Sequence, residues 1–122
     1  VGVTCCYGAC LKKHDQDIKD HMSICNIYLG NSAYGYFGSS TTACVNDLVK
    51  PDTIVRMFLL YVLRGESLGN AVLMARQEFI KEELKNTGSL SASAQRVLVQ
   101  FNLMGYSPIR TVGYLPFLRS KL

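Results

Sequence analysis

Two short apolar runs on either side of a helical segment constrain the fold of this chain more than any other feature. Val1–Cys5 is apolar and partly β-branched, and Ala33–Phe37 is apolar and aromatic, as is typical of buried strands. Apolar residues recur at helical spacing between them as far as Leu29, and Gly30-Asn31 ends that helix. Consecutive strands joined by a helix pair in parallel through a right-handed crossover. The order therefore predicts an α/β fold.

Capping residues and apolar periodicity predict four helices in all. Their predicted first residues are, in chain order, Asp17 or Asp20, Pro51-Asp52, Ser67, and Ser91 or Ser93. The last helix is predicted to carry Phe101 on its apolar stripe and to end at Gly105, and Ile109–Val112 is predicted as an edge strand. The polar run Gly38–Thr42 is predicted to follow the second strand.

Length and composition indicate a single folded unit. The chain has 122 residues, of which 48% are hydrophobic and 18% are charged, and a chain of this size buries enough surface to form a core. A sheet of two or three strands is thin for helices this apolar, and Val1 opens directly into an apolar stretch with no initiator Met. We therefore expect residues 1–122 to start within a longer protein that supplies further strands to the sheet, with residues 113–122 as a tail.

Net charge and cysteine content indicate which binding partners and which cellular compartment to expect. The net charge is +4, with basic residues scattered among acidic ones, whereas nucleic-acid-binding domains cluster their cations on one face. No apolar run reaches the roughly 18 residues that span a bilayer. The five cysteines are an odd number, which is unusual for a secreted disulfide scaffold. We expect a cytoplasmic protein that binds neither a membrane nor nucleic acid directly.

Cys6 lies where a nucleophile is displayed in proteins of this class. It follows a buried strand and precedes a turn containing Gly8, and ligands of open α/β sheets bind at the carboxyl ends of the strands. Gly8 permits close backbone approach, and neighbouring amides can stabilise an oxyanion. A nucleophilic cysteine needs a base, usually His. His14 and His21 are the candidates within the chain, and the alternative for both is an ordinary surface histidine.

A zinc site is a second interpretation of the same region. Its ligands would come from Cys6, Cys10, His14, His21 and Cys25. Structural zinc sites usually have tighter spacing, such as Cys-x2-Cys in a loop-rich chain. Here the first cysteine ends an apolar strand and the last lies in an apolar helix, so we expect no metal ligand set.

Four stretches, taken together in their order and spacing, carry a family resemblance. They are Thr4–Ala9, Ala33–Thr42, Leu63–Phe79 and Gln100–Pro108. The first contains the run Cys-Cys-Tyr-Gly, the third contains G-x-S-L-G-x-A and A-R-Q-x-F, and the fourth contains Q-F-x-L-x-G. Together they resemble the catalytic-cysteine portion of caspase-like cysteine peptidases, in the bacterial branch that includes gingipain-like and CHAT-domain proteins. The resemblance covers about residues 1–112.

The resemblance implies the C-terminal part of a caspase-like α/β/α sandwich with a mostly parallel sheet, incomplete on its own. It implies a cysteine endopeptidase with a Cys-His dyad, in which Cys6 is the nucleophile and Tyr7 and Gly8 support the oxyanion. The dyad His would precede Cys6 in an upstream segment, so neither His14 nor His21 matches it. No cofactor or metal is implied. The implied partners are the N-terminal half of the same domain, a protein substrate and an attached regulatory or sensor domain.

The resemblance also assigns a substrate-binding role to the segment after the second strand. Gly38, Ser39, Ser40 and Thr41 would help to shape the pocket for the residue before the cut. The alternative is a hydroxyl-rich turn that caps the next segment, and the sequence does not separate the two.

Three functions therefore stay open. The leading prediction is the cysteine endopeptidase. The second is a non-catalytic protein-interaction domain of the same fold, and the third is a small zinc-binding module.

Overall fold

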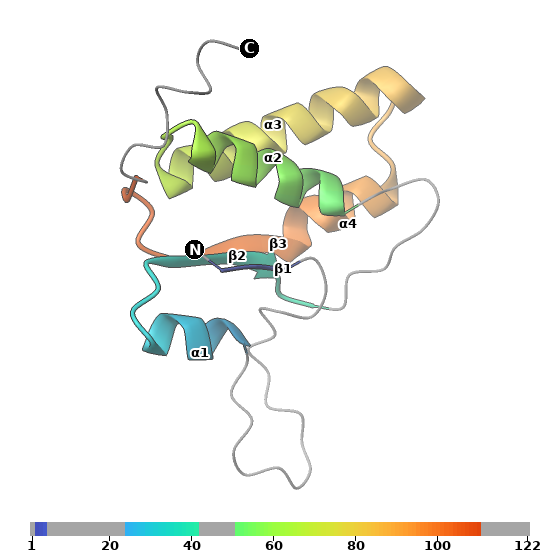
Figure 1. Cartoon of the computed structure of the whole chain (residues 1–122). Helices are drawn as coiled ribbons and strands as arrows, with labels where there is room; N and C mark the ends of the chain where they lie inside the picture. Colours follow the sequence, from blue (N-terminus) through green and yellow to red (C-terminus); the bar gives the residue numbers. More distant parts are fainter. Residues whose placement is uncertain (1, 5–23, 42–50, 111–122) are drawn as a thin grey trace, which may run out of the picture.

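The computed structural model describes residues 2–4, 24–41 and 51–110. These residues form both helices and strands, as expected for an α/β chain (Figure 1). The elements are, in order, β1 (Gly2–Thr4), α1 (Ile24–Gly30), β2 (Gly35–Ser39), α2 (Asp52–Leu63), α3 (Leu68–Thr87), α4 (Ala92–Gln100) and β3 (Phe101–Gly105).

The three described strands form one sheet in the order β1-β2-β3. β1 pairs with β2 in parallel, with Thr4 opposite Gly38, which confirms the parallel pairing predicted across the first helix. β2 pairs with β3 in the antiparallel sense, with Gly38 opposite Asn102. The described sheet is therefore mixed, with one parallel and one antiparallel pairing, where the resemblance implied a mostly parallel one.

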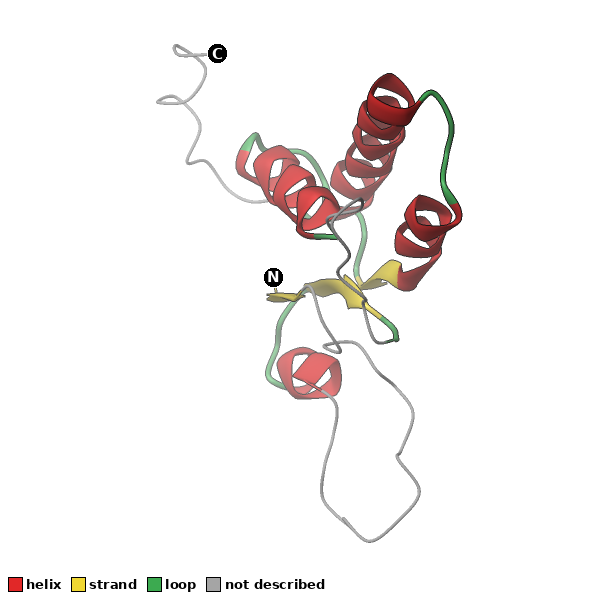
Figure 2. Ribbon diagram, turned by 90° about the vertical axis from the view of Figure 1, so that its right-hand side faces the viewer, coloured by secondary structure: helices red, strands yellow, loops and turns green. Residues whose placement is uncertain are grey.

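Helices cover both faces of this sheet. α1 lies against one face, and α2, α3 and α4 lie against the other (Figures 1 and 2). Successive side chains of a strand point to opposite faces. Tyr36 accordingly packs with Cys25 on the α1 side, whereas Phe37 joins the larger core beneath the other three helices.

The larger core is built on aromatic rings from three elements. The ring of Phe37 on β2 lies 4.4 Å from that of Phe58 on α2 and 5.9 Å from that of Phe101 on β3, measured between centroids. All three side chains are fully buried. Offset aromatic pairs at these separations stabilise a core beyond the area they bury.

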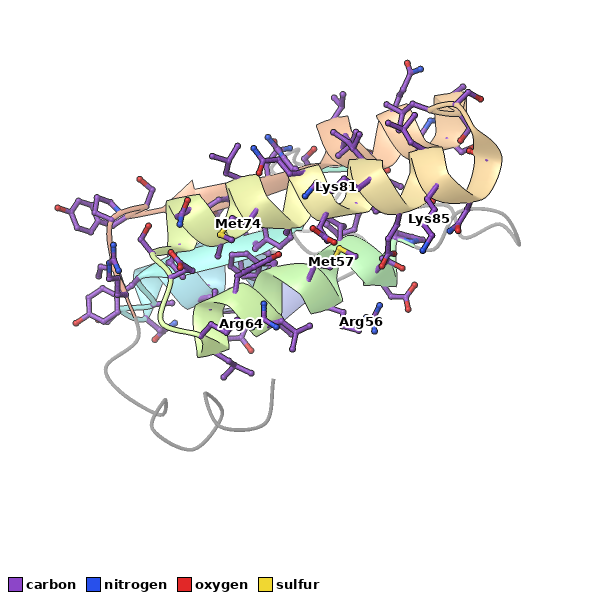
Figure 3. The ribbon with its side chains drawn as sticks, turned by 90° about the horizontal axis from the view of Figure 1, so that it is seen from above. Arg56, Met57, Arg64, Met74, Lys81 and Lys85 are labelled. Carbon is purple, nitrogen blue, oxygen red and sulfur yellow. The ribbon has the colours of Figure 1, made fainter. Side chains whose placement is uncertain are left out.

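α2 and α3 lie side by side above that core, as Figure 3 shows from above. Met57 of α2 is buried, while Arg56 and Lys81 are exposed on the outer surface of the pair. The buried positions of α2 recur at helical spacing, but its exposed side also carries the leucines Leu59, Leu60 and Leu63.

The predicted starts of the last three helices are confirmed. α2 begins at Asp52 after Pro51, and the hydroxyl of Ser67 accepts a hydrogen bond from the Asn70 amide at 3.3 Å at the start of α3. At the start of α4 the capping residue is Ser91, whose hydroxyl accepts from the Ala94 amide at 3.1 Å. The predicted starts of the first helix, at Asp17 or Asp20, lie outside the described residues.

The second strand was predicted two residues too early. It spans Gly35–Ser39, where the sequence indicated Ala33–Phe37. Gly38 and Ser39, expected in the loop beyond the strand, are buried strand residues paired with Asn102 and Phe101. Small side chains fit here because β2 is covered on both faces.

The predicted C-terminal elements were also partly wrong. Phe101–Gly105 is strand β3 and not the end of a helix, because α4 ends at Gln100. In place of the start of the predicted edge strand at Ile109, Arg110 makes a single bridge to Ser67. Residues 111 and 112 and the predicted tail, residues 113–122, lie outside the described residues.

Across the described ranges, none of the helices combines the length and the apolar character that crossing a membrane requires.

Candidate functional site

The carboxyl end of β2 carries the four residues predicted to bind substrate, and their exposure increases along the chain. Gly38 and Ser39 are buried within the strand, Ser40 is half-buried, and Thr41 is exposed. Thr4, the last described residue of β1, lies beside Gly38. The carboxyl ends of the two parallel strands therefore meet at one edge of the sheet.

Hydroxyl groups in this segment donate hydrogen bonds to the main chain. Ser39 Oγ donates to the Thr41 carbonyl at 2.5 Å. Ser40 donates to the Gln100 carbonyl twice, from its amide at 2.9 Å and from its hydroxyl at 3.1 Å. Serine hydroxyls form such local bonds in turns. The segment is therefore a turn held by hydrogen bonds, in which the hydroxyl hydrogens of Ser39 and Ser40 are already donated to main-chain carbonyls.

Gln100 connects this turn to the junction between α4 and β3. Its side-chain Nε2 donates to Thr41 Oγ1 at 2.7 Å. Asn102, two residues further on, donates from Nδ2 to the carbonyls of Val99 and Gln100, both at 3.0 Å. The Gln100 carbonyl thus accepts hydrogen bonds from Ser40, in the turn after β2, and from Asn102 on β3.

Arg76 reaches the same junction from α3. Its Nη2 donates to the Phe101 carbonyl at 2.7 Å and lies 3.5 Å from Asn102 Oδ1. Its Nε is buried, with no hydrogen-bond partner in the part of the chain that the structure describes. Within those same ranges no carboxylate lies at ion-pair distance from its guanidinium. Among the described residues, Arg76 therefore acts as a hydrogen-bond donor to the main chain.

Arg76, Gln100 and Asn102 form with Ser40 and Thr41 a set of contacts that we call the junction network. Sequence reasoning included the first three only as letters of the family resemblance and gave them no role. The available signal was their polar character beside apolar helix and strand residues. What joins them is tertiary, because Gln100 and Thr41 are 59 positions apart.

The predicted nucleophile region lies outside the described residues. This holds for Cys6 and for the predicted oxyanion supports Tyr7 and Gly8, and equally for His14 and His21. Their roles stay predictions.

Cys25 is the cysteine that the structure does describe, and it is buried. Its thiol donates to the sulfur of Met104 across 3.4 Å, between α1 and the sheet. Burial raises the pKa of the Cys25 thiol, because the thiolate would lose its hydration. A protonated, inaccessible thiol is neither a nucleophile nor a ready zinc ligand.

The described ranges 2–4, 24–41 and 51–110 also hold no cluster of three or more His, Cys, Asp or Glu side chains suited to a metal ion. The other proposed zinc ligands, among them Cys10, lie outside these ranges.

Comparisons of the chain with protein-family models, with curated proteins and with solved structures find no match.

Proposed function

We propose that this chain is the C-terminal portion of a caspase-like cysteine endopeptidase, with Cys6 as the nucleophile. Two lines of evidence support the proposal. Four sequence stretches follow the order of that family. In addition, the described elements form an α/β/α arrangement around a sheet with a parallel β1–β2 pair (Figure 1).

The register between Thr4 and Gly38 is the observation that carries the proposal. The carboxyl ends of β1 and β2 lie side by side there, at the kind of edge where open α/β sheets bind ligands. Cys6 follows Thr4 by two residues in the sequence, and its own position lies outside the described residues.

The proposed reaction is hydrolysis of a peptide bond in two steps. The Cys6 thiolate attacks the carbonyl carbon, the C–N bond breaks to leave a thioester, and the dyad His protonates the departing amine. Water then attacks the thioester, releasing a carboxylate and restoring the thiol. Backbone amides near Tyr7 and Gly8 would stabilise the oxyanion in both steps. The proposed His belongs to the upstream part of the domain, the proposed partner of this chain.

The turn after β2 would line the pocket for the substrate residue before the cut. Ser39 and Ser40 already donate their hydroxyl hydrogens to carbonyls. The turn would therefore contribute shape, backbone groups and the exposed Thr41, more than free hydroxyl donors. A cytoplasmic location and an attached sensor domain belong to the same proposal.

One observation favours the second candidate, a protein-interaction domain of the same fold. The outer face of α1 exposes Ile24, Ile27 and Tyr28, which are 49%, 45% and 49% accessible. Apolar side chains gathered on one helix face are typical of contact surfaces.

Peptide hydrolysis by the natural full-length protein tests the proposal. We expect turnover of an unstructured protein substrate, and we expect Cys6→Ala to lower kcat/KM by at least about a thousandfold, as loss of a nucleophile does. Cys5→Ala, one residue away, is the matched control and should keep activity. If the folded protein shows no turnover, or if Cys6→Ala leaves turnover intact, the endopeptidase assignment is wrong and the interaction domain is favoured.

A further inference from the structure

The junction network joins three elements that are distant in the sequence. Arg76 reaches from the middle of α3, Gln100 is the last residue of α4, and Thr41 follows β2. The network lies at the edge where β2 ends beside the carboxyl end of β1. Its members are thus close to the proposed substrate pocket without belonging to the proposed dyad.

We propose that Gln100 and Arg76 are positioning residues that fix the backbone of Ser40 and Thr41 for substrate binding. This inference rests on the proposed function and adds to it the groups that hold the pocket turn in place.

Gln100 holds the turn through both its main chain and its side chain. Its carbonyl accepts from the amide and the hydroxyl of Ser40, and its Nε2 donates to Thr41 Oγ1. The Gln100–Thr41 bond is a contact between side chains, so a substitution of Gln100 removes it while the main-chain bonds remain. The expected consequence is a looser Thr41 with an intact sheet.

Arg76 fixes the main chain directly after Gln100, through a hydrogen bond to the Phe101 carbonyl. Phe101, whose carbonyl accepts from the guanidinium, is the strand residue paired with Ser39. One guanidinium nitrogen carries two N–H groups, and the Nη2 of Arg76 faces both the Phe101 carbonyl and Asn102 Oδ1. Among the described residues, the contacts that hold the Arg76 side chain at this junction are those of its Nη2 to the Phe101 carbonyl and to Asn102 Oδ1.

A looser turn affects binding more than bond cleavage. Under the proposed function, the attacking sulfur belongs to the chain that leaves β1, whereas Ser40 and Thr41 contact the substrate side chain. Removing the side-chain amide of Gln100 should therefore raise KM. The kcat and the alkylation rate of Cys6 should stay unchanged. A purely structural defect would instead lower the fraction of active enzyme, which active-site titration measures.

The test compares Gln100→Met and Gln100→Glu with the matched control Gln95→Met on the same helix. Gln95 is exposed, and its Nε2 donates to the Leu90 carbonyl, away from the junction. Gln100→Met keeps the length of the side chain and removes the donor. Gln100→Glu keeps a bond to Thr41, because the threonine hydroxyl can turn to donate to a carboxylate.

Two readouts are measured on the natural full-length protein. Loss of one hydrogen bond should raise the hydrogen-exchange rate of the Ser40 amide about three- to tenfold in Gln100→Met. KM should rise by a similar factor at unchanged kcat. In Gln100→Glu, KM and the Ser40 exchange rate should both stay within about twofold of the parent. Gln95→Met should change neither quantity.

The same two readouts test Arg76. Arg76→Met should raise the Ser40 exchange rate and KM as Gln100→Met does. Arg96 is an exposed arginine on α4, and Arg96→Met should raise neither.

The outcomes separate this inference from the proposed function. If the parent protein hydrolyses peptides and Gln100→Met leaves KM and the Ser40 exchange rate unchanged, the positioning role is overturned and the peptidase stands. If Gln100→Met lowers kcat and KM rises equally in Gln95→Met, the effect is general destabilisation and the positioning role is again overturned. If the parent shows no turnover, the proposed function fails and the substrate role fails with it. Exchange at Ser40 then reports only whether the network holds the turn.

Discussion

Thr4, the last described residue of β1, lies directly beside Gly38 in a parallel register. Gly38 in turn faces Asn102 across the antiparallel pairing, so three strands meet at one level of the sheet. Beyond this level β2 turns into Ser40 and Thr41, and β1 is followed in the sequence by the cysteine pair. Under the proposed function, this register would put the chemistry and the pocket at one edge of the sheet.

Gly105 cannot be replaced without moving main chain. Its φ is +122°, and an added Cβ would lie 2.5 Å from the Tyr34 carbonyl oxygen and 2.7 Å from the Gly35 Cα. We expect Gly105→Ala to lower the free energy of unfolding by at least about 2 kcal/mol, because strain at a positive φ adds to a backbone clash. Urea denaturation measures this. Gly30→Ala is the control, since nothing lies within 4 Å of its added Cβ, and a cost equal to that of Gly105→Ala would contradict the account.

Two leucines on α3 should differ sharply in their contribution to stability. Leu68 is fully buried over Gly35, whereas Leu73 is 55% exposed. Leu68→Ala should cost about 2–5 kcal/mol through lost burial and a cavity, and Leu73→Ala should change stability by no more than about 0.5 kcal/mol. Thermal or chemical denaturation of the two variants compares them directly. Equal effects would mean that α3 packs through a different face.

Ser91 should stabilise α4 through its cap. Its hydroxyl accepts from the Ala94 amide, and loss of such a cap typically costs about 1 kcal/mol. Ser91→Ala should show that loss in urea denaturation. Ser91→Gly should cost only a few tenths of a kcal/mol, because glycine leaves the helix end open to water. A Ser91→Ala variant as stable as the parent would show that the cap does not stabilise α4.

The pH dependence of stability should carry the signature of the buried Cys25 thiol. Its pKa is raised above the ordinary value of 9.0 by burial. The unfolded chain therefore loses this proton at a lower pH than the native state, and the free energy of unfolding falls as the pH rises through and above 9.0. Below that range the thiol is protonated in both states and contributes no slope.

Cys25→Ala isolates this effect, since all other titrating groups are kept. The variant should lose less stability than the parent between neutral pH and pH values above 9.0. Parallel curves for the two proteins would show that the thiol is not desolvated in the native state.

Local signals predicted most of the helical part of the fold. Pro51-Asp52, Ser67 and Ser91 mark helix starts through contacts within one turn, so the sequence alone contains the relevant information. The strand pairing across α1 was likewise predictable, because a strand-helix-strand order leaves one common solution.

β3 was missed because its sequence, Phe-Asn-Leu-Met-Gly, alternates between apolar and polar residues over only three positions. Phe101 and Leu103 pack into the core beneath α2, α3 and α4, while Met104 packs on the α1 side with Cys25. A strand covered on both faces carries apolar residues on both. Phe101 also continues the helical spacing of α4, so periodicity indicated a longer helix. Only the pairing with β2 in the folded protein makes residues 101–105 a strand and not the end of α4.

The junction network was unpredictable for the same kind of reason. Hydrogen bonds from Arg76 and Gln100 to residues far along the chain have no local pattern. The boundary of β2 belongs here too, since Gly38 and Ser39 look like turn residues until their neighbours Thr4 and Phe101 are known.

The rate at which each cysteine is alkylated, mapped by mass spectrometry over a range of pH on the natural full-length protein, tests the central claim most directly. A nucleophile beside a histidine has a depressed thiol pKa. The account predicts that Cys6 reacts fastest and stays reactive well below pH 8, while the buried Cys25 stays protected until the protein unfolds. Cys6 reacting no faster than Cys5 and Cys10, with the pH dependence of an ordinary thiol, would contradict the account.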